Sequence, residues 1–544
     1  MQRKLQKHTV YVLTFGVLYL NSCRSTDTDD TLAGTGTAMV DINFLGTDFS
    51  DSLPLQASAS KDKPGGIPNE TMQRHTLLLD PSTVVISEIT PVLEPLKNSA
   101  RTLNGAIAAV DGNPLVTGDK FRIIAYKQSD KKYKSYKDYT VGLPADPIML
   151  DSNVAYDIIA YSYGKTLPPI DPKEQTDLNS ATIDYDNTGR DLDFMYQKTS
   201  ITPNKTGSNV LNIKLRHKLT LLQSVTFRSY MGNINSISGN PLLGSHYTKG
   251  TFPLNTGIMI GRSNPTNIQL TFTKTDNTTW SATAPSFPMY INGAGKGTGS
   301  FSATVNFNNI FNNNAAEDKV INLPNSFNLT PETRKELTFT LAKCGAYLGP
   351  NQTLWRDFMC HNLGADYSAD PFTPSAAIHG AKYQWGAQTN ETGRYISQSY
   401  DQSNSGVIPG WKSYVTPKPN GSWSDTNKTA NDPCPSGYRV PTQAQWQAVI
   451  DNNDNVEGVG SWNDGNYTSA LYFRNSSNIR TLMLPTAGRR FATDGLLYSR
   501  GNLAYYWSSS IFTSNAQILF FYNTGVNVGK FDRTNGIPVR CIAE

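Results

Sequence analysis

The chain is dominated by short segments in which β-branched and aromatic residues alternate with polar ones. The clearest segments are TAMVDINFLGTDF (37–49), KFRIIAYK (120–127), AYDIIAYSYG (155–164) and LNIKLRHKLTLLQSVTF (211–227). Alternation with a period of two puts one set of side chains on a buried face, as in a strand. Clusters of Pro, Gly and Asn separate the segments, and few windows keep a helical period. The sequence before residue 340 therefore predicts two consecutive β-sandwiches that divide near residue 210.

The first 23 residues have the features of a bacterial export signal. A basic start, QRKLQK, precedes an apolar run (10–20) that is too short to hold the chain in a bilayer as a helix. The run ends in LNSC (20–23), which resembles a lipobox, although Asn21 departs from the usual small or β-branched residue. The resemblance implies that residues 1–22 are a signal peptide and that Cys23 carries the lipid, for stable attachment to the outer membrane. An ordinary secretory signal with a chance cysteine is the alternative.

The tether and the overall composition fit a protein of the cell surface. The segment RSTDTDD (24–30) resembles the acidic tract that directs lipoproteins of Bacteroidota to the outer leaflet. Only 17% of the 544 residues are charged, and the net charge of +4 is spread without a basic stripe. This pattern gives no reason to expect a nucleic-acid partner. The mature chain is long enough for about three domains.

Four cysteines remain if Cys23 is lipidated, and all of them follow residue 343. An even number in an oxidising compartment predicts two disulfides, for which three connectivities are possible. The simplest joins Cys344 to Cys360 and Cys434 to Cys541. The second bridge would tie the turn NDPCPSGY (431–438) to the last strand, and closing so long a loop is worth roughly 4–5 kcal/mol. The cysteines also predict a domain boundary near residue 340.

A helix is expected directly after that cysteine-containing turn. Thr442 and Gln445 fit a capping box, in which each side chain accepts a hydrogen bond from the backbone of the other residue. Trp446, Val449 and Ile450 then recur at helical spacing and form one apolar face. The polar run at 451–455 ends the helix.

Two segments of the N-terminal part are similar to a known family. The segments YDIIAYSYGKTLPP (156–169) and DFMYQKTSIT…LRHKL (193–219), in this order, resemble the fimbrillin-like pilins of Bacteroidota. The resemblance covers about residues 35–340 and implies two transthyretin-like β-sandwiches. It also implies partners, because such pilins polymerise when a strand of one subunit fills a groove in the next. A generic β-sandwich lipoprotein of the cell surface is the alternative.

The last 200 residues resemble a second family, the FISUMP domain. Its motifs appear in their usual order as LWRDFMCHNLGAD (354–366), AKYQWGA (381–387), DPCPSGYRVPTQAQW (432–446), LMLPTAGRR (482–490), YYWSSS (505–510) and PVRCIAE (538–544). The resemblance implies an α+β fold similar to C-type lectins, with long displayed loops and with Cys434 bonded to Cys541. The expected fold class is therefore mainly β, with two sandwiches followed by an α+β domain.

Enzymatic signatures are missing from the sequence. The six histidines show no HExxH or paired metal spacing, and no GxSxG is present. DNNDNVEG (451–458) has Val456 where a calcium loop needs glycine, and WND (462–464) lies far upstream of the final cysteine, so we interpret both as solvated loops, with a calcium site as the alternative. We therefore expect no catalytic residue, no metal and no cofactor.

Recognition through surface loops is the remaining possibility. Trp411, Trp423 and Trp462 lie in Gly-, Asn- and Ser-rich stretches, where aromatic rings can contact a sugar or a protein. The same residues could equally belong to a local core. The working hypothesis is a fimbrial tip or accessory subunit that acts as an adhesin toward a host or bacterial receptor. The alternative is a cell-anchored glycan-binding lipoprotein outside any fimbria.

The expected organisation follows from these assignments. It comprises the signal peptide (1–22), a tether with the first strand and a cleavable segment (23–74), two sandwiches (75–210 and 211–342) and the FISUMP domain (343–544). The family's precursors lose their first strand to an arginine- or lysine-specific protease, which implies cleavage after Arg74, with Lys61 and Lys63 as further candidates. Since residue 541 would be bridged, we also expect a subunit that receives a strand without donating one, which favours a terminal position in the fimbria.

Overall fold

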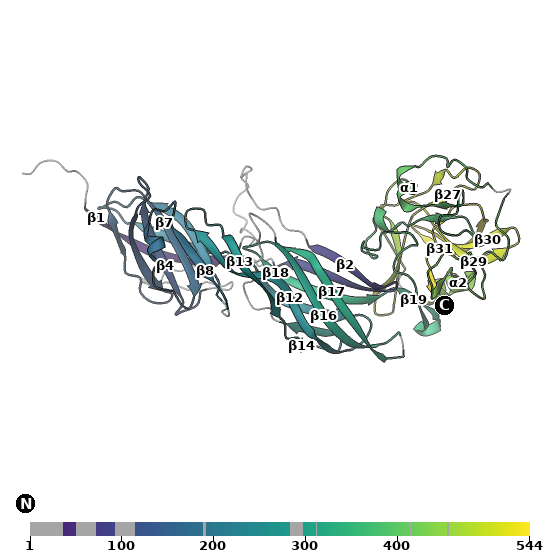
Figure 1. Cartoon of the computed structure of the whole chain (residues 1–544), viewed down its shortest axis with the longest axis horizontal. Coiled ribbons are helices and arrows are strands. Elements are labelled where there is room, and N and C mark those ends of the chain that lie inside the picture. Colours follow the sequence, from purple (N-terminus) through teal and green to yellow (C-terminus); the bar gives the residue numbers. More distant parts are fainter. Residues whose placement is uncertain are drawn as a thin grey trace, which may run out of the picture.

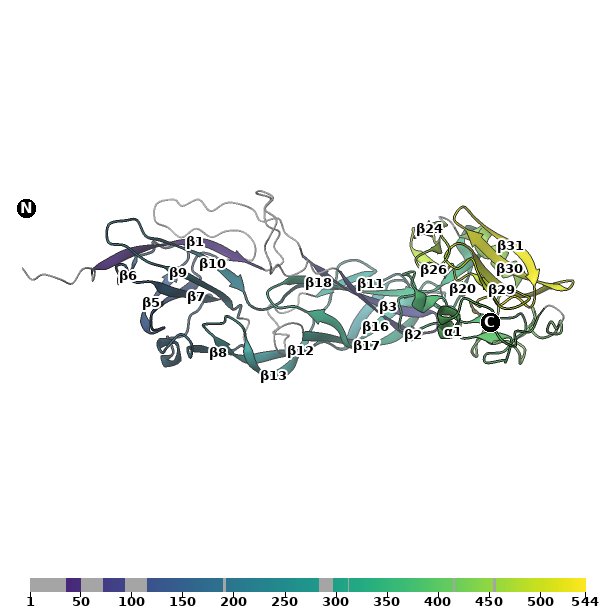
Figure 2. The ribbon, with the colours of Figure 1, turned by 90° about the horizontal axis from the view of Figure 1, so that it is seen from above.

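The computed structural model describes residues 36–49, 72–92, 115–188, 192–282, 297–311, 313–413, 416–453 and 456–544. Cys23, Lys61 and Lys63 lie outside these ranges. The described chain is mainly β and forms three modules in a row, with β1 at one end and the C-terminal module at the other (Figure 1). Viewed from the perpendicular direction, β2 extends along the middle module toward the C-terminal one (Figure 2).

The first module is a seven-stranded sheet with an apolar core on each face. In sheet order its strands are β5 (Tyr133–Thr140), β4 (Lys120–Lys127), β7 (Tyr156–Gly164), β9 (Met195–Ile201), β10 (Val210–His217), β1 (Thr37–Asp48) and β6 (Ile148–Asp151). All seven strands contribute to one core, so the sheet curls around it. The other face packs against β8 (Thr182–Asp186) and the end of β12 (Ile234–Pro253).

The second module packs two sheets around one large core. The first sheet consists of β14 (Thr273–Lys274), β15 (Thr279–Ala282), β11 (Leu221–Ser229), β18 (Arg334–Lys343), β3 (Thr83–Pro91) and β2 (Gln73–Asp80). The second consists of β13 (Ile260–Gln269), β12, β16 (Gly297–Asn309) and β17 (Ala315–Leu329), with β8 paired to the end of β12. Because β12 contributes to the cores of both modules, it joins them without a flexible linker.

The expected domain boundaries at 75 and 210 are wrong in two places. The β2–β3 hairpin pairs with β18 and belongs to the second module, although it was assigned to the first sandwich. Strand β10 pairs with β1 and β9 in the first module, although it was assigned to the second. Alternation in the sequence shows which face of a strand is buried. It does not show which strand lies beside it, because pairing depends on side-chain complementarity across the ladder.

The C-terminal module combines two helices with several short sheets. Its elements are β19 (Gly345–Gly349), β20 (Thr353–Asp357), β21 (Lys382–Tyr383), β22 (Tyr395–Ile396), α1 (Gln398–Ser403), β23 (Tyr438–Arg439), α2 (Gln443–Asn452), β24 (Glu457–Val459), β25 (Ala470–Arg474), β26 (Arg480–Pro485), β27 (Arg489–Arg490), β28 (Leu497–Tyr498), β29 (Ala504–Phe512), β30 (Asn515–Tyr522), β31 (Gly525–Asp532) and β32 (Ile542–Ala543). The expected helix is confirmed as α2, with the capping box of Thr442 and Gln445 in place. Trp446 and Val449 are buried on its inner face.

The β2–β3 hairpin connects the second module to the C-terminal one. Its turn accepts two backbone hydrogen bonds, from Cys344 N to Ser82 O (2.8 Å) and from Cys360 N to Pro81 O (2.7 Å). A shared core lies behind this turn, and it consists of Val84, Ile86, Ala342, Cys344, Cys360, Phe372, Ile378, Ala470, Tyr472 and Met483. Beside it, Phe311 stacks on Trp355 with ring centroids 4.0 Å apart. Continuous packing of this kind resists bending between the two modules.

Two neighbouring residues of β1 offer a direct test of its role in the first module. Val40 is fully buried and Met39 is 58% exposed, since successive side chains of a strand point to opposite faces. We expect Val40→Asp to lower the free energy of unfolding of the first module by at least about 3 kcal/mol, because it buries a charge in an apolar core. The control Met39→Asp should change it by less than about 0.5 kcal/mol.

Amide hydrogen exchange, measured on both variants, shows whether the effect arises at β1. We expect β6 and β10 to lose protection in Val40→Asp and to keep it in Met39→Asp. Equal protection of β6 and β10 in the two variants would contradict the assigned position of β1.

Candidate functional site

Strand β1 joins two strands that otherwise have no contact in the sheet order. Its first four residues pair antiparallel with β6, and residues 41–48 pair parallel with β10. Within the described part of the chain, β1 is the only ladder partner of β6. Gly46 lies in a bulge of the β1–β10 ladder with a φ of 96°, a conformation that glycine adopts without steric cost.

The inward side chains of β1 fill one core of the first module. Ala38, Val40 and Phe44 are at most 4% exposed, and Phe44 stacks on Phe121 of β4 at 5.0 Å. Burial of side chains of this size contributes roughly 3–6 kcal/mol in total. Since whole domains are stable by about 5–15 kcal/mol, the first module depends heavily on this one strand.

The C-terminal end of β1 is held by charge and by ring stacking. Arg216 of β10 donates two hydrogen bonds to the Asp48 carboxylate, at 2.5 and 3.0 Å, and Lys214 approaches the same group at 3.1 Å. Phe49 follows and stacks face to face on His217, with centroids 3.9 Å apart. These contacts were not among the features predicted from the sequence. The only sign of these contacts in the sequence is that Lys214 and Arg216 are two cations at alternate positions of β10.

The cleavage candidates differ in their surroundings. Arg74 lies inside β2, opposite Glu88 of β3, and its guanidinium contacts Glu88 at 3.1 Å and Asp370 of the C-terminal module at 2.7 Å. Lys61 and Lys63 lie outside the described residues. Proteases act on extended segments that are not engaged in a sheet, so the end of β2 would have to open before Arg74 could be cleaved.

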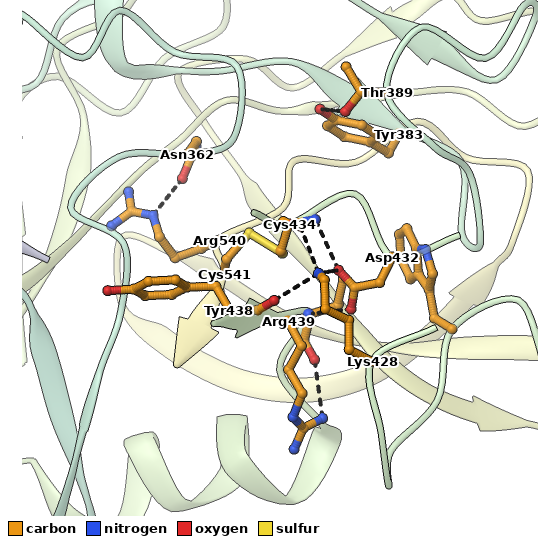
Figure 3. Close-up of a disulfide and its surroundings, with 12 residues drawn as sticks. Asn362, Tyr383, Thr389, Lys428, Asp432, Cys434, Tyr438, Arg439, Arg540 and Cys541 are labelled. Atoms are coloured by element: carbon orange, nitrogen blue, oxygen red, sulfur yellow. Dashed lines mark hydrogen bonds and ion pairs between the residues drawn. A yellow bond between two sulfur atoms is a disulfide. The ribbon is translucent and has the colours of Figure 1, made fainter. Parts of the chain in front are cut away.

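The structure contains both disulfides, in the simplest of the three pairings. Cys434 and Cys541 are 107 residues apart in sequence and are both buried (Figure 3). Lys428 stabilises the cysteine-containing turn, since its ammonium donates to the carbonyl oxygens of Cys434 (2.7 Å) and Tyr438 (2.8 Å). The bridge therefore fixes the turn before α2 to the residue that directly precedes β32, the strand that pairs with β23.

A fully buried ion network supports the loops of the C-terminal module. Lys382 and Arg490 contact the Asp401 carboxylate at 2.5 and 2.7 Å, and all three side chains are at most 1% exposed. Burial alone would raise the pKa of Asp401, but the two cations outweigh it and hold that pKa below its usual value. Removing one partner would leave an uncompensated buried charge, so the network fixes one arrangement of the loops.

Two of the three tryptophans singled out in the sequence are buried, and the third is partly exposed. Trp411 is 8% exposed and Trp423 is 1% exposed, and the Trp423 indole donates to Asn431 O at 3.0 Å. Trp462 is half-buried and packs edge-on against Phe521. The first two side chains are core residues, because the long loops of this module pack on one another and need apolar side chains of their own.

The described ranges contain neither a metal site nor a membrane-spanning helix. No group of three His, Cys, Asp or Glu side chains has an arrangement that could hold a metal ion. None of the helices there combines the length and the apolar character needed to cross a bilayer.

The chain is similar in structure to several known proteins, although its sequence has no match. No family model matches the sequence, and no curated protein matches it. Among solved structures, a candidate cell adhesion protein from Bacteroides fragilis is 13% identical over 56% of this chain and 92% of its own, with a TM-score of 0.26.

Two proteins of Porphyromonas gingivalis are similar at the same level. The tip fimbrial protein Mfa3 is 10% identical over 42% of this chain and 95% of its own, with a TM-score of 0.23. The fimbrial anchor protein Mfa2 is 14% identical over 36% of this chain and 71% of its own, with a TM-score of 0.21. Scores of this size carry no argument about function.

The two disulfides should contribute unequally to stability. In the chain-entropy model the bridge over 107 residues is worth about 4–5 kcal/mol and the bridge over 16 residues about 3 kcal/mol. We therefore expect the double variant Cys434→Ser/Cys541→Ser to unfold at lower denaturant concentration than Cys344→Ser/Cys360→Ser. Tryptophan fluorescence reports on this module, since every tryptophan except Trp280 follows residue 343. The reverse order of midpoints would contradict the account.

Proposed function

We propose that this chain is a tip or accessory subunit of a fimbria, made as a lipid-anchored precursor and assembled by strand donation. One observation carries the proposal: β1 lies at the start of the described chain, yet it completes the sheet of the first module by joining β6 to β10. The resemblance of residues 35–340 to fimbrillin-like pilins supports the same reading.

Loss of β1 would create a site that only another strand can fill. It would leave the edge of β10 unpaired, take from β6 its ladder partner among the described strands, and open the core around Phe44. Unpaired backbone groups beside an apolar groove accept an extended segment from another chain. The roughly 3–6 kcal/mol contributed by β1 is large enough that the module would need such a replacement.

Removal of β1 requires a single cut between β1 and β2. We propose that the cut follows Lys61 or Lys63 and not Arg74, because Arg74 is engaged in a strand ladder and in two ion pairs. Either cut would free the lipid on Cys23 together with the first strand. The β2–β3 hairpin, which holds the C-terminal module, would stay in place.

The C-terminal module is the part that we propose recognises a receptor. It lies at the opposite end of the molecule from β1, so a subunit joined through the first module would present it outward (Figure 1). Its disulfide and its buried ion network hold long loops in one arrangement, as binding surfaces require. The non-fimbrial alternative, a glycan-binding lipoprotein on the cell, uses the same module but never loses β1.

N-terminal sequencing of the chain recovered from purified fimbriae tests the proposal. We expect a start at Asp62 or Pro64, which shows that β1 and the lipid have been removed. A start at His75 would show that the strand is still released, by a cut after Arg74. A chain that retains an acylated Cys23, or that is found only in the membrane fraction, would contradict strand donation and leave the non-fimbrial alternative. Fimbriae from a strain lacking the lysine- and arginine-specific proteases provide the control.

A further inference from the structure

A short hairpin on the C-terminal module presents two adjacent arginines in opposite directions. The strands β27 and β28 form the hairpin, and Arg489 pairs with Tyr498 while Arg490 pairs with Leu497. Its turn requires Gly495, which has a φ of 74° and where a Cβ atom would lie 2.7 Å from Ile408. Because successive strand residues point to opposite faces, only one of the two arginines enters the core.

Arg490 is the inward residue and fixes the hairpin. Its fully buried guanidinium donates to the Asp401 carboxylate at 2.7 Å and to the carbonyl oxygens of Asp401 (2.9 Å), Gly406 (3.1 Å), Gly495 (3.1 Å) and Asn404. All of these acceptors belong to the α1 region or to the hairpin turn. The position of the outward residue is thereby set before any ligand arrives.

Arg489 is the outward residue and lies among four aromatic rings. Its guanidinium carbon is 4.8 to 5.7 Å from the ring centroids of Phe531, Phe491, Tyr505 and Tyr498. The side chain is half-buried and donates one hydrogen bond, from Nη1 to Asn535 Oδ1 at 2.5 Å. We call Arg489 and these four rings the Arg489 platform.

The charge of the Arg489 platform has no counter-ion within the described chain. No Asp or Glu of the described ranges forms an ion pair with Arg489, and the one acceptor that its guanidinium contacts there is the neutral Asn535 Oδ1. Arg480 gives a direct contrast, because it also lies over a ring, that of Tyr472 at 3.9 Å, but is paired with Glu457. An arginine with no carboxylate partner, held beside partly exposed rings, can bind an external anion through charge-assisted hydrogen bonds.

The rings define what else the ligand must contain. Tyr498 is 43% exposed, Phe491 and Phe531 are half-buried, and Tyr505 is nearly buried, so the platform is open on the Tyr498 side. Exposed ring faces bind flat apolar surfaces, and an arginine in a fixed position binds a carboxylate through two parallel hydrogen bonds. A sugar ring with a carboxylate combines both features, because its C–H face is flat and apolar.

We propose that the Arg489 platform binds an acidic sugar at the end of a glycan, with the carboxylate on Arg489 and the sugar ring on Tyr498 and Phe491. This inference deepens the recognition role proposed for the C-terminal module. It does not depend on whether the chain enters a fimbria, so the two proposals can fail separately. An acidic peptide has the same charge but lacks the flat ring face. It is the alternative ligand that the experiment must distinguish from an acidic sugar.

Titration of the full chain with glycans tests the site. The probes are oligosaccharides that end in glucuronic, galacturonic or N-acetylneuraminic acid, each compared with the same sugar after reduction of its carboxyl group. We expect at least one acidic sugar to bind at least about tenfold more tightly than its reduced form. Binding of none of the acidic sugars, or equal binding of acidic and reduced forms, would overturn the proposal.

Variants then assign the binding to the Arg489 platform. Arg489→Gln and Tyr498→Ala should each weaken the acidic sugar at least about tenfold, and Arg489→Lys should weaken it less than Arg489→Gln. Arg480→Gln is the matched control, since it removes an arginine stacked on a tyrosine elsewhere on the same module and should leave affinity unchanged. Circular dichroism establishes that the variants are folded, and Tyr498→Ala, at an exposed position, serves if Arg489→Gln does not fold.

A peptide probe separates the remaining possibility. A glutamate-rich peptide should bind at least about tenfold more weakly than the best acidic sugar. Tighter binding of the peptide, abolished by Arg489→Gln, would overturn the sugar assignment.

Discussion

The structure depends on a strand that is distant in sequence from the strands it pairs with. β1 reaches β10 across about 170 residues and β6 across about 110, and it is connected to the rest of the fold by residues 49–72. Its apolar residues close the core, its last residue, Asp48, binds Arg216, and the next residue, Phe49, stacks on His217. A strand placed this way can be exchanged without altering the path of the remaining chain, as the proposed assembly mechanism requires.

The second constraint is the β2–β3 hairpin, which follows β1 in sequence and serves a different module. It pairs with β18 on one side, and its turn receives hydrogen bonds from Cys344 and Cys360. The shared core and the Arg74–Asp370 ion pair extend the contact into the C-terminal module. A cut before the hairpin therefore separates two functions: the first module loses its strand, while the C-terminal module keeps its support.

Sequence reasoning succeeded where one local pattern determines one outcome. Alternation predicted the strands at 37–49, 120–127 and 155–164, and the capping box at Thr442 predicted the start of α2. An even number of cysteines allowed the correct pairing to be named as the simplest. In each case the controlling residues are close in sequence or few in number.

It failed where the outcome depends on which distant segments meet. Alternation in the 211–227 segment could not show that β10 belongs to the first module and β11 to the second. Trp423 lies among Gly and Asn residues that are typical of exposed loops, yet the loops of this module form their own core. Arg489 and Arg490 are adjacent residues of the same type. Only the direction of the hairpin determines that Arg490 is buried in the ion network and that Arg489 points outward.

In the proposed mechanism, β1 leaves the first module when the subunit is assembled. A disulfide between β1 and β10 tests this most directly, through the double variant Asn43→Cys/Asn212→Cys, since these residues are ladder partners whose side chains lie 2.7 Å apart. We expect the oxidised variant to be cleaved but to keep β1 and to be missing from purified fimbriae, while the reduced variant and each single variant are incorporated. Incorporation of the oxidised variant at the level of the unmodified chain would contradict it.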